Sequence, residues 1–267
     1  MTNWNGKTLV IAGGSSGLGF AIARALSKHQ CSVVLLARNA SRLEAAALEL
    51  EPEAASRVLP LSVDLLDEQK LDETVQRIVS EFGKIDGWFN CVGQSIRVSF
   101  KEAALQDYRR LMEQNFFTSV IGSLAALPHL EKTNGTLVNI GSLASKTAWP
   151  WIAPYVTSKH ALAGFAKQLR IEGPPNVHYL FVCPGPIRSD KKDRYAEQAK
   201  NLPKQASGPA AGAPVNRLEP DALASRILDA CAKKKIELVL PAKTKILFLL
   251  QQISAKIGDW LVRRSCQ

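Results

Sequence analysis

Short apolar runs alternate with longer amphipathic stretches from one end of the chain to the other. The short runs are rich in Val, Leu and Ile and nearly continuous, which is typical of strands buried on both faces of a sheet. They cover residues 7–12, 32–37, 58–63, 85–91, 135–141, 177–183 and 236–240. Apolar positions at helical spacing predict helices over residues 17–29, 40–50, 68–82, 104–130, 154–170 and 221–232.

This alternation predicts an α/β fold, because parallel strands that follow one another need helical crossovers, and right-handed crossovers cover both faces of the sheet. We expect a single Rossmann-type, doubly wound parallel sheet of about seven strands, with helices on both faces and an extra C-terminal helix. The chain has 267 residues, which allows one large domain. Residues 1–242 are predicted to form that domain, since no linker precedes residue 184.

Two segments do not fit the alternation. Residues 184–218 form a long connection rich in Pro, Gly, Ala, Lys and Asp, and a connection of that length is typical of a functional loop or lid. Residues 243–267 are predicted to form a C-terminal amphipathic, basic helix. Its apolar stripe fits three interpretations, namely packing on its own domain or on a second copy, contact with a membrane surface, or neither. The stripe comprises Ile246, Leu249, Leu250, Ile253, Ile257, Trp260 and Leu261.

Composition narrows the class of protein. The five cysteines contain no CxxC pair, which argues against a disulfide framework and a metal site. The chain begins with a polar segment that leads directly into a strand, so we expect no signal peptide and a cytoplasmic protein. The net charge is +10, and residues 188–267 hold 16 basic and 8 acidic residues. No aromatic residues are interleaved with the lysines, so we expect no nucleic-acid partner, whereas peripheral membrane contact stays open.

The first strand is followed by a glycine-rich turn, Gly13-Gly14-Ser15-Ser16-Gly17-Leu18-Gly19, and then by a helix. Glycines allow a tight turn, and the free N–H groups of the helix N-terminus attract phosphate. A turn in this context favours a dinucleotide, although the spacing G-x3-G-x-G differs from the commoner G-x-G-x-x-G. We therefore interpret residues 1–242 as a dinucleotide-binding domain that also carries the catalytic residues.

The second strand ends at Arg38, where a binder of NAD(H) would carry an acidic residue. A guanidinium suits a 2′-phosphate, so the sequence favours NADP(H), although an ordinary arginine at a helix entry is the alternative. Asp64 ends the third strand and either accepts the adenine amino hydrogens or caps the next helix.

Tyr155 and Lys159 lie four residues apart on one predicted helix face, and Ser142 ends the strand that precedes this helix. The spacing of tyrosine and lysine alone has little specificity. The pair becomes more specific because it follows the glycine turn and Ser142 along the chain. Residues 149–151 and residues 94–100 are candidates for the apolar wall of a substrate cavity, although tryptophan is more often ordinary core.

Over residues 7 to about 240 the chain resembles the short-chain dehydrogenase/reductase family. The resemblance rests on the glycine turn, Asp64, Asn90-Cys91-Val92-Gly93, Asn115, Ser142, Tyr155, Lys159 and Pro184-Gly185-Pro186-Ile187-Arg188-Ser189. It implies that the catalytic residues are Asn115, Ser142, Tyr155 and Lys159. Together with the residue chemistry, it predicts a cofactor site formed by Gly13, Ser15, Ser16, Gly17, Leu18, Gly19, Arg38, Asp64, Leu65, Asn90, Gly93, Tyr155, Lys159, Pro184, Gly185, Ile187 and Ser189. The chain departs from the family pattern at Ala12, Cys91-Val92 and Ser189.

The resemblance implies an oxidoreductase that transfers hydride between nicotinamide and a carbonyl or alcohol group. With the preference for NADP(H) that Arg38 indicates, we expect an NADP(H)-dependent enzyme acting on a modestly apolar small molecule. Tyr155 would act as acid or base, Ser142 would hold the substrate oxygen, and Asn115 would kink its helix and position Lys159 through water. Family members usually associate as homodimers or homotetramers. Two alternatives stay open: an NADP-binding sensor or scaffold with little turnover, and a lipid- or sterol-type keto reductase peripheral to a membrane.

Overall fold

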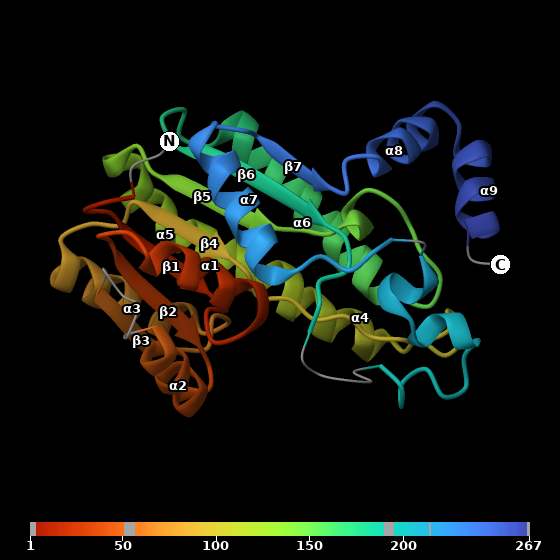
Figure 1. Ribbon diagram of the computed structural model, residues 1–267, viewed down its shortest axis with the longest axis horizontal. Coiled ribbons are helices and arrows are strands. Elements are labelled where there is room, and N and C mark those ends of the chain that lie inside the picture. Colours follow the sequence, from red (N-terminus) through yellow and green to blue (C-terminus); the bar gives the residue numbers. More distant parts are fainter. Residues whose placement is uncertain (1–3, 51–56, 190–194, 214, 266–267) are drawn as a thin grey trace.

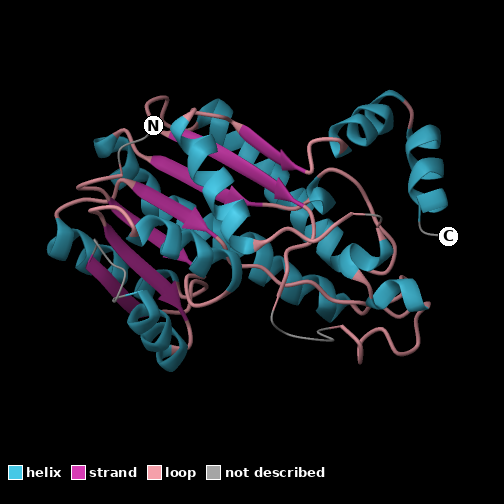
Figure 2. Cartoon of the chain, viewed as in Figure 1, coloured by secondary structure: helices cyan, strands magenta, loops and turns pink. Residues whose placement is uncertain are grey.

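The computed structural model describes residues 4–50, 57–189, 195–213 and 215–265. In this part of the chain, the strands form one parallel sheet in the order β3-β2-β1-β4-β5-β6-β7, with helices on both faces (Figures 1 and 2). The predicted doubly wound sheet is thereby confirmed. The strands are β1 (Thr8–Ala12), β2 (Ser32–Ala37), β3 (Arg57–Ser62), β4 (Gly87–Asn90), β5 (Thr136–Ile140), β6 (His178–Pro184) and β7 (Glu237–Leu240).

Successive residues of the central strands contribute to two different apolar cores. Leu9 and Ile11 of β1 pack in the core formed with α1, α2 and α7, whereas Val10 packs in the core formed with α3 and α5. Both cores need apolar residues, so the strands carry apolar runs without alternation. The helices are α1 (Gly17–Ser27), α2 (Ala40–Leu50), α3 (Glu68–Phe82), α4 (Leu105–Met112), α5 (Thr118–Thr133), α6 (Ala153–Glu172), α7 (Pro220–Ala232), α8 (Thr244–Ile253) and α9 (Ala255–Ser265).

The helical regions differ from the sequence predictions in two places. The stretch predicted as one helix over 104–130 is α4 and α5 joined by a π-helical turn at Glu113–Phe117. The C-terminal helical region is divided at Ser254, whose extended backbone separates α8 from α9. Of the predicted loop and tail, residues 190–194, 214 and 266–267 lie outside the described residues.

The strand order places the candidate site. The chain reverses direction across the sheet between β1 and β4, because β2 and β3 lie on one side of β1 and the later strands on the other. Such a reversal leaves a crevice at the carboxyl ends of the strands, where ligands of open α/β sheets bind. The glycine turn leaves β1 at this edge, and the segment beginning at Cys91 leaves β4 there.

Candidate active site

The turn between β1 and α1 is held in a form that requires glycine. Gly13 and Gly17 have φ angles of 89° and 58°, in the left-handed region. A Cβ atom on Gly19 would lie 2.3 Å from the carbonyl oxygen of Gly13, so α1 approaches the turn too closely for any side chain there. The N-cap residue Ser16 makes no side-chain capping bond, which leaves N–H groups of the first helical turn available to an anion.

The neighbouring strand exits supply basic and acidic groups to the same crevice. Arg38 is exposed at the end of β2, and Arg42, from the first turns of α2, lines the same cavity. Asp64 Oδ1 accepts a hydrogen bond from the Leu66 amide at 3.1 Å. The capping interpretation of Asp64 is wrong, because Asp67 is the N-cap of α3 and accepts from the Lys70 amide.

Asn90 is buried and points away from the crevice. Its Nδ2 donates to Asn139 Oδ1 at 2.9 Å and to Ser123 Oγ at 3.0 Å, and its Oδ1 accepts from Trp88 Nε1 at 2.8 Å. A buried amide with these partners has a structural task, namely joining β4 to β5 and α5. Asn90 does not line the cavity that holds most of the other predicted residues.

Asn115 lies fully buried in the π-helical turn. Its Nδ2 donates to Ser158 Oγ and to the Gln94 carbonyl, both at 2.9 Å, and its Oδ1 accepts from the Gln94 amide at 2.7 Å. The side chain therefore ties the segment after β4 to α6, one residue before Lys159. The wider π turn brings Asn115 to this position, as π turns often do at functional sites.

Lys159 is 3% exposed, and its Nζ donates to the Ile140 carbonyl at 2.9 Å. Burial lowers the pKa of Lys159 to about 8, although the nearby Cys183 and Cys91 oppose this shift. The ammonium form therefore still predominates at pH 7. Nζ lies 6.0 Å from the centre of the Tyr155 ring, one helical turn away. A Cβ atom on Gly93 would lie 3.3 Å from Nζ, so a glycine here leaves room for the ammonium.

Ser142 and Tyr155 both line the cavity and are half-buried. Ser142 follows β5 and caps a short 3-10 helix, where its Oγ accepts from the Ala144 amide at 3.1 Å. The hydroxyl hydrogen takes no part in that bond, so the cap interaction leaves Ser142 able to donate. Tyr155 lies in the first turn of α6, in an apolar cluster with Trp149 and Ile152.

One cavity of about 1750 Å³ joins these groups at the carboxyl ends of the strands. Three predicted site residues do not line it, namely Gly19, Asn90 and Asn115, which lie behind its wall. The predicted residues that do line it are Gly13, Ser15, Ser16, Gly17, Leu18, Arg38, Asp64, Leu65, Gly93, Ser142, Tyr155, Lys159, Pro184, Gly185, Ile187 and Ser189.

Known proteins are similar to this chain in sequence and in fold. The sequence model of the family described as short chain dehydrogenase matches residues 7–200. The chain belongs to the short-chain dehydrogenase family. A Drosophila melanogaster relative, Dehydrogenase/reductase SDR family protein 7-like, is 30% identical over 97% of this chain and 80% of its own length.

Two further similarities are more distant. The 11-beta-hydroxysteroid dehydrogenase of Pinus massoniana is 27% identical, and the match covers 97% of this chain and 73% of that protein. The crystal structure of L-sorbose reductase from Gluconobacter frateurii, complexed with NADPH and L-sorbose, has a TM-score of 0.78 at 26% identity. That match covers 88% of this chain and 95% of the reductase.

Arg97 of this short-chain dehydrogenase lies in the segment 94–100, which the sequence offered as an apolar cavity wall, and it lines the cavity as a buried cation whose role the sequence did not reveal. It is buried, its guanidinium stacks 3.9 Å from the centre of the Tyr195 ring, and its Nε donates to the Ala206 carbonyl at 2.8 Å. Its backbone amide donates to Gln198 Oε1 at 2.9 Å. Arg97 therefore fastens the loop after β6 to the segment after β4. These partners are about 100 residues away in the chain, so no local pattern marks them.

The remaining predictions for the dehydrogenase cavity concern the residues that form its wall and the presence of a metal site. Gln94, Ser95 and Trp149 line the cavity, whereas Trp151 does not and Phe100 is exposed. The first turn of α8 also contributes, a contact that the sequence did not suggest. Among the described residues, no group of three or more His, Cys, Asp or Glu side chains is arranged to hold a metal ion.

Proposed function

We propose that the protein is an NADP(H)-dependent carbonyl reductase or alcohol dehydrogenase acting on a modestly apolar small molecule. One observation carries this proposal: Ser142, Tyr155 and Lys159 share a cavity with a glycine turn, a helix N-terminus and an exposed arginine. The NADPH complex of the sorbose reductase supports the choice of cofactor.

The residues present fit a phosphorylated dinucleotide. A Cβ atom on Gly19 would collide with the Gly13 carbonyl, so glycine lets α1 begin close to the turn, and Ser16 leaves the helix N-terminus uncapped. Arg38, with Arg42 beside it along the cavity, would hold the 2′-phosphate by charge-assisted hydrogen bonds. Asp64 and Leu65 would adjoin the adenine, and Pro184, Gly185, Ile187 and Ser189 the nicotinamide. The bound cofactor supplies or accepts the hydride.

The chain's own residues manage the proton and the substrate oxygen. Ser142 donates its hydroxyl hydrogen to the substrate carbonyl and orients it. Tyr155 gives its phenolic proton to the carbonyl oxygen in reduction and removes the proton from the hydroxyl in oxidation. Lys159 holds a positive charge one helical turn from Tyr155, and an adjacent cation favours the phenolate. Asn115 keeps α6 and the segment after β4 in register.

Several apolar side chains line the cavity. Trp149, Ile152, Leu247 and Phe248 contribute to this wall. Arg97 holds the loop of residues 195–208 beside it. Burying an apolar substrate there is favourable by about 25 cal/mol per Å² of apolar surface. The similarity to a hydroxysteroid dehydrogenase supports an apolar substrate.

Exposed apolar residues on α4, at the end of the π turn and on α5 support assembly as a homodimer or homotetramer through this region. Phe117 and Leu124 lie seven residues apart, so they share one helical face, and both are exposed. Leu105 at the start of α4 is exposed as well. Light scattering should give a mass two or four times that of one chain.

The testing experiment measures NADPH oxidation with ketones and aldehydes graded in size and polarity. Tyr155→Phe retains the ring and removes the phenolic proton, so turnover should fall at least about 100-fold while NADPH affinity changes little. Equal turnover in both proteins would remove Tyr155 from the mechanism. Tight NADPH binding without turnover of any compound would instead favour a cofactor-binding sensor or scaffold.

A further inference from the structure

The two C-terminal helices carry an uncovered row of large apolar side chains. On α8, Ile246, Leu249 and Ile253 are 66%, 58% and 71% exposed, and on α9, Ile257 and Trp260 are 48% and 54% exposed. The residues on α8 are three and four positions apart and those on α9 are three apart, so each set lies on one face of its helix. Soluble monomers rarely leave such a concentration of apolar surface exposed without a binding role. We call these five residues the apolar row.

The helices pack on each other and on the domain through their other faces. Phe248 of α8 is buried in the core formed with β6, β7 and α6. A Cβ atom on Gly258 would lie 2.1 Å from Gln251 Cγ, so α9 contacts α8 closely at this glycine. Beyond β7, the pair extends from the body of the molecule, with α9 at its outer edge (Figure 1). The packing therefore fixes the pair and leaves the apolar row uncovered.

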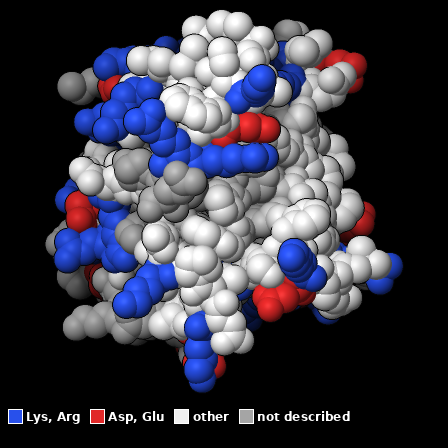
Figure 3. Space-filling model, turned by 90° about the vertical axis from the view of Figure 1, so that its right-hand side faces the viewer, with Lys and Arg blue, Asp and Glu red and all other residues white. Residues whose placement is uncertain are grey.

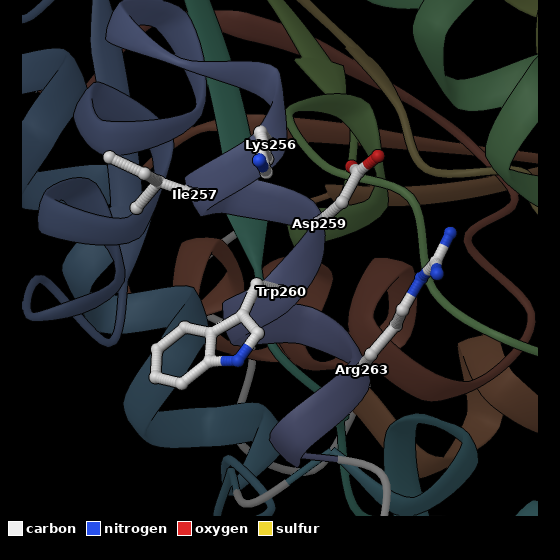
Figure 4. A pocket seen from close by; sticks show the side chains of 5 residues that line it. All are labelled: Lys256, Ile257, Asp259, Trp260 and Arg263. Carbon is white, nitrogen blue, oxygen red and sulfur yellow. The ribbon is translucent and has the colours of Figure 1, made fainter.

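Positive charge surrounds the apolar row. Lys243, Lys245, Lys256, Arg263 and Arg264 are all exposed. Asp259 is the single acidic residue in the sequence from 243 onward. On α9, Ile257 and Trp260 extend to one side of the helix while Asp259 and Arg263 extend to the other (Figure 4). The face that includes this end of the molecule shows more basic than acidic side chains, with uncharged surface between them (Figure 3).

We propose that this pair of helices docks on the surface of an anionic phospholipid bilayer, with the apolar row inserted at the boundary between headgroups and acyl chains. Apolar side chains with a tryptophan, flanked by exposed lysines and arginines, are the combination that binds such an interface. Lipid phosphates complement the basic residues, whereas a second copy of this basic pair would repel it. Within the described residues, no helix has the length and apolar character needed to cross a bilayer.

The docked pair also borders the substrate cavity, which extends the proposed function and rests on it. Leu247 and Phe248 line the cavity from the side of α8 opposite the apolar row, and Lys243 and Thr244 line it from the start of the helix. Docking would hold this end of the cavity near the lipid. The substrate class that follows is a ketone or alcohol dissolved in the bilayer.

The test compares the full-length protein with bound NADPH and the variant Ile253→Glu/Trp260→Glu in co-sedimentation with vesicles. Vesicles contain either equal parts of phosphatidylglycerol and phosphatidylcholine or phosphatidylcholine alone. The unmodified protein should bind the anionic vesicles at least about 10-fold more strongly than the neutral ones, and less at high salt. The variant should lose at least about 10-fold in binding. Leu48→Glu, which changes an exposed leucine of α2, is the matched control and should bind normally.

Two further measurements separate the outcomes. Failure to bind anionic vesicles, or equal binding by the variant, would overturn the proposal. So would light scattering showing that the variant breaks an oligomer, because the apolar row would then be covered by a second copy. With active enzyme, the variant should lose turnover of a bilayer-dissolved ketone and retain turnover of a water-soluble one. If no carbonyl is reduced at all, the proposed function fails while vesicle binding still tests the docking.

Discussion

Replacing Lys159 by Met should abolish turnover and nevertheless stabilise the fold. Lys159 is 3% exposed, and burial lowers its pKa from 10.5 to about 8. That difference corresponds to about 3 kcal/mol by which the folded environment disfavours the ammonium. Methionine has a similar length and no charge, but it gives up the charged hydrogen bond to Ile140, worth about 1.5–3 kcal/mol. At pH 7 we therefore expect the free energy of unfolding of Lys159→Met to be higher by up to about 2 kcal/mol.

The sign of the pH dependence follows from the same pKa. The folded value lies below the unfolded one, so between about pH 8 and 10.5 the unfolded chain binds more protons at Lys159 than the folded chain does. The destabilisation of the folded state by the buried ammonium of Lys159 therefore decreases as the pH rises through this window. Between pH 7 and pH 9 the unmodified protein should gain about 1 kcal/mol relative to Lys159→Met. Titrating groups that do not interact with Lys159 are common to both proteins and cancel in the comparison.

Urea unfolding at pH 7 and pH 9 measures both quantities. Lys167→Met is the control, because Lys167 is exposed on the same helix and its ammonium is solvated in both states. This control should show little difference at either pH. A stability difference between Lys159→Met and the unmodified protein that does not change with pH would refute the buried ammonium. Retained turnover in Lys159→Met would refute its part in the reaction, for which a loss of at least about 100-fold is expected.

Two other substitutions test the ends of the cavity. Arg38→Asp should weaken NADPH binding by roughly 10- to 100-fold and change NADH binding little, because a charged hydrogen bond contributes about 1.5–3 kcal/mol. Calorimetry measures both affinities, and equal weakening of the two cofactors would exclude a contact between Arg38 and the 2′-phosphate. Arg97→Met removes the donors to Ala206 and Gly208 and the stacking on Tyr195. In steady-state kinetics, Arg97→Met should raise KM roughly 5- to 30-fold with a smaller effect on kcat, and Arg97→Lys should recover part of the loss. An unchanged KM would show that the loop does not shape the substrate site.

The sheet was predictable because each strand meets a helix layer on both faces. Leu9 and Val10, adjacent in sequence, serve opposite cores, and this requirement produces the apolar runs that mark the strands. The ends of those strands then indicated most of the cavity, because parallel strands deliver their carboxyl ends to one edge of the sheet.

Features set by contacts distant in sequence were not predictable. The π turn around Asn115 has no compositional mark, since its residues continue the apolar pattern of the flanking helices. The break at Ser254 is hidden because Ile253 and Ile257 keep helical spacing across it. Asn90 follows a family motif, yet its partners Trp88 and Asn139 direct it into the sheet.

The central claim is that the chain transfers hydride between NADP(H) and a carbonyl carbon. NADPH deuterated at C4, in each of its two stereochemical forms, tests this directly with an aldehyde or ketone and mass spectrometry of the alcohol. We predict that one form labels the carbinol carbon with a single deuterium in the presence of the unmodified protein and that Tyr155→Phe yields almost no labelled alcohol. Absence of labelled alcohol from both forms, across the whole panel of carbonyl compounds, would contradict the proposed reductase.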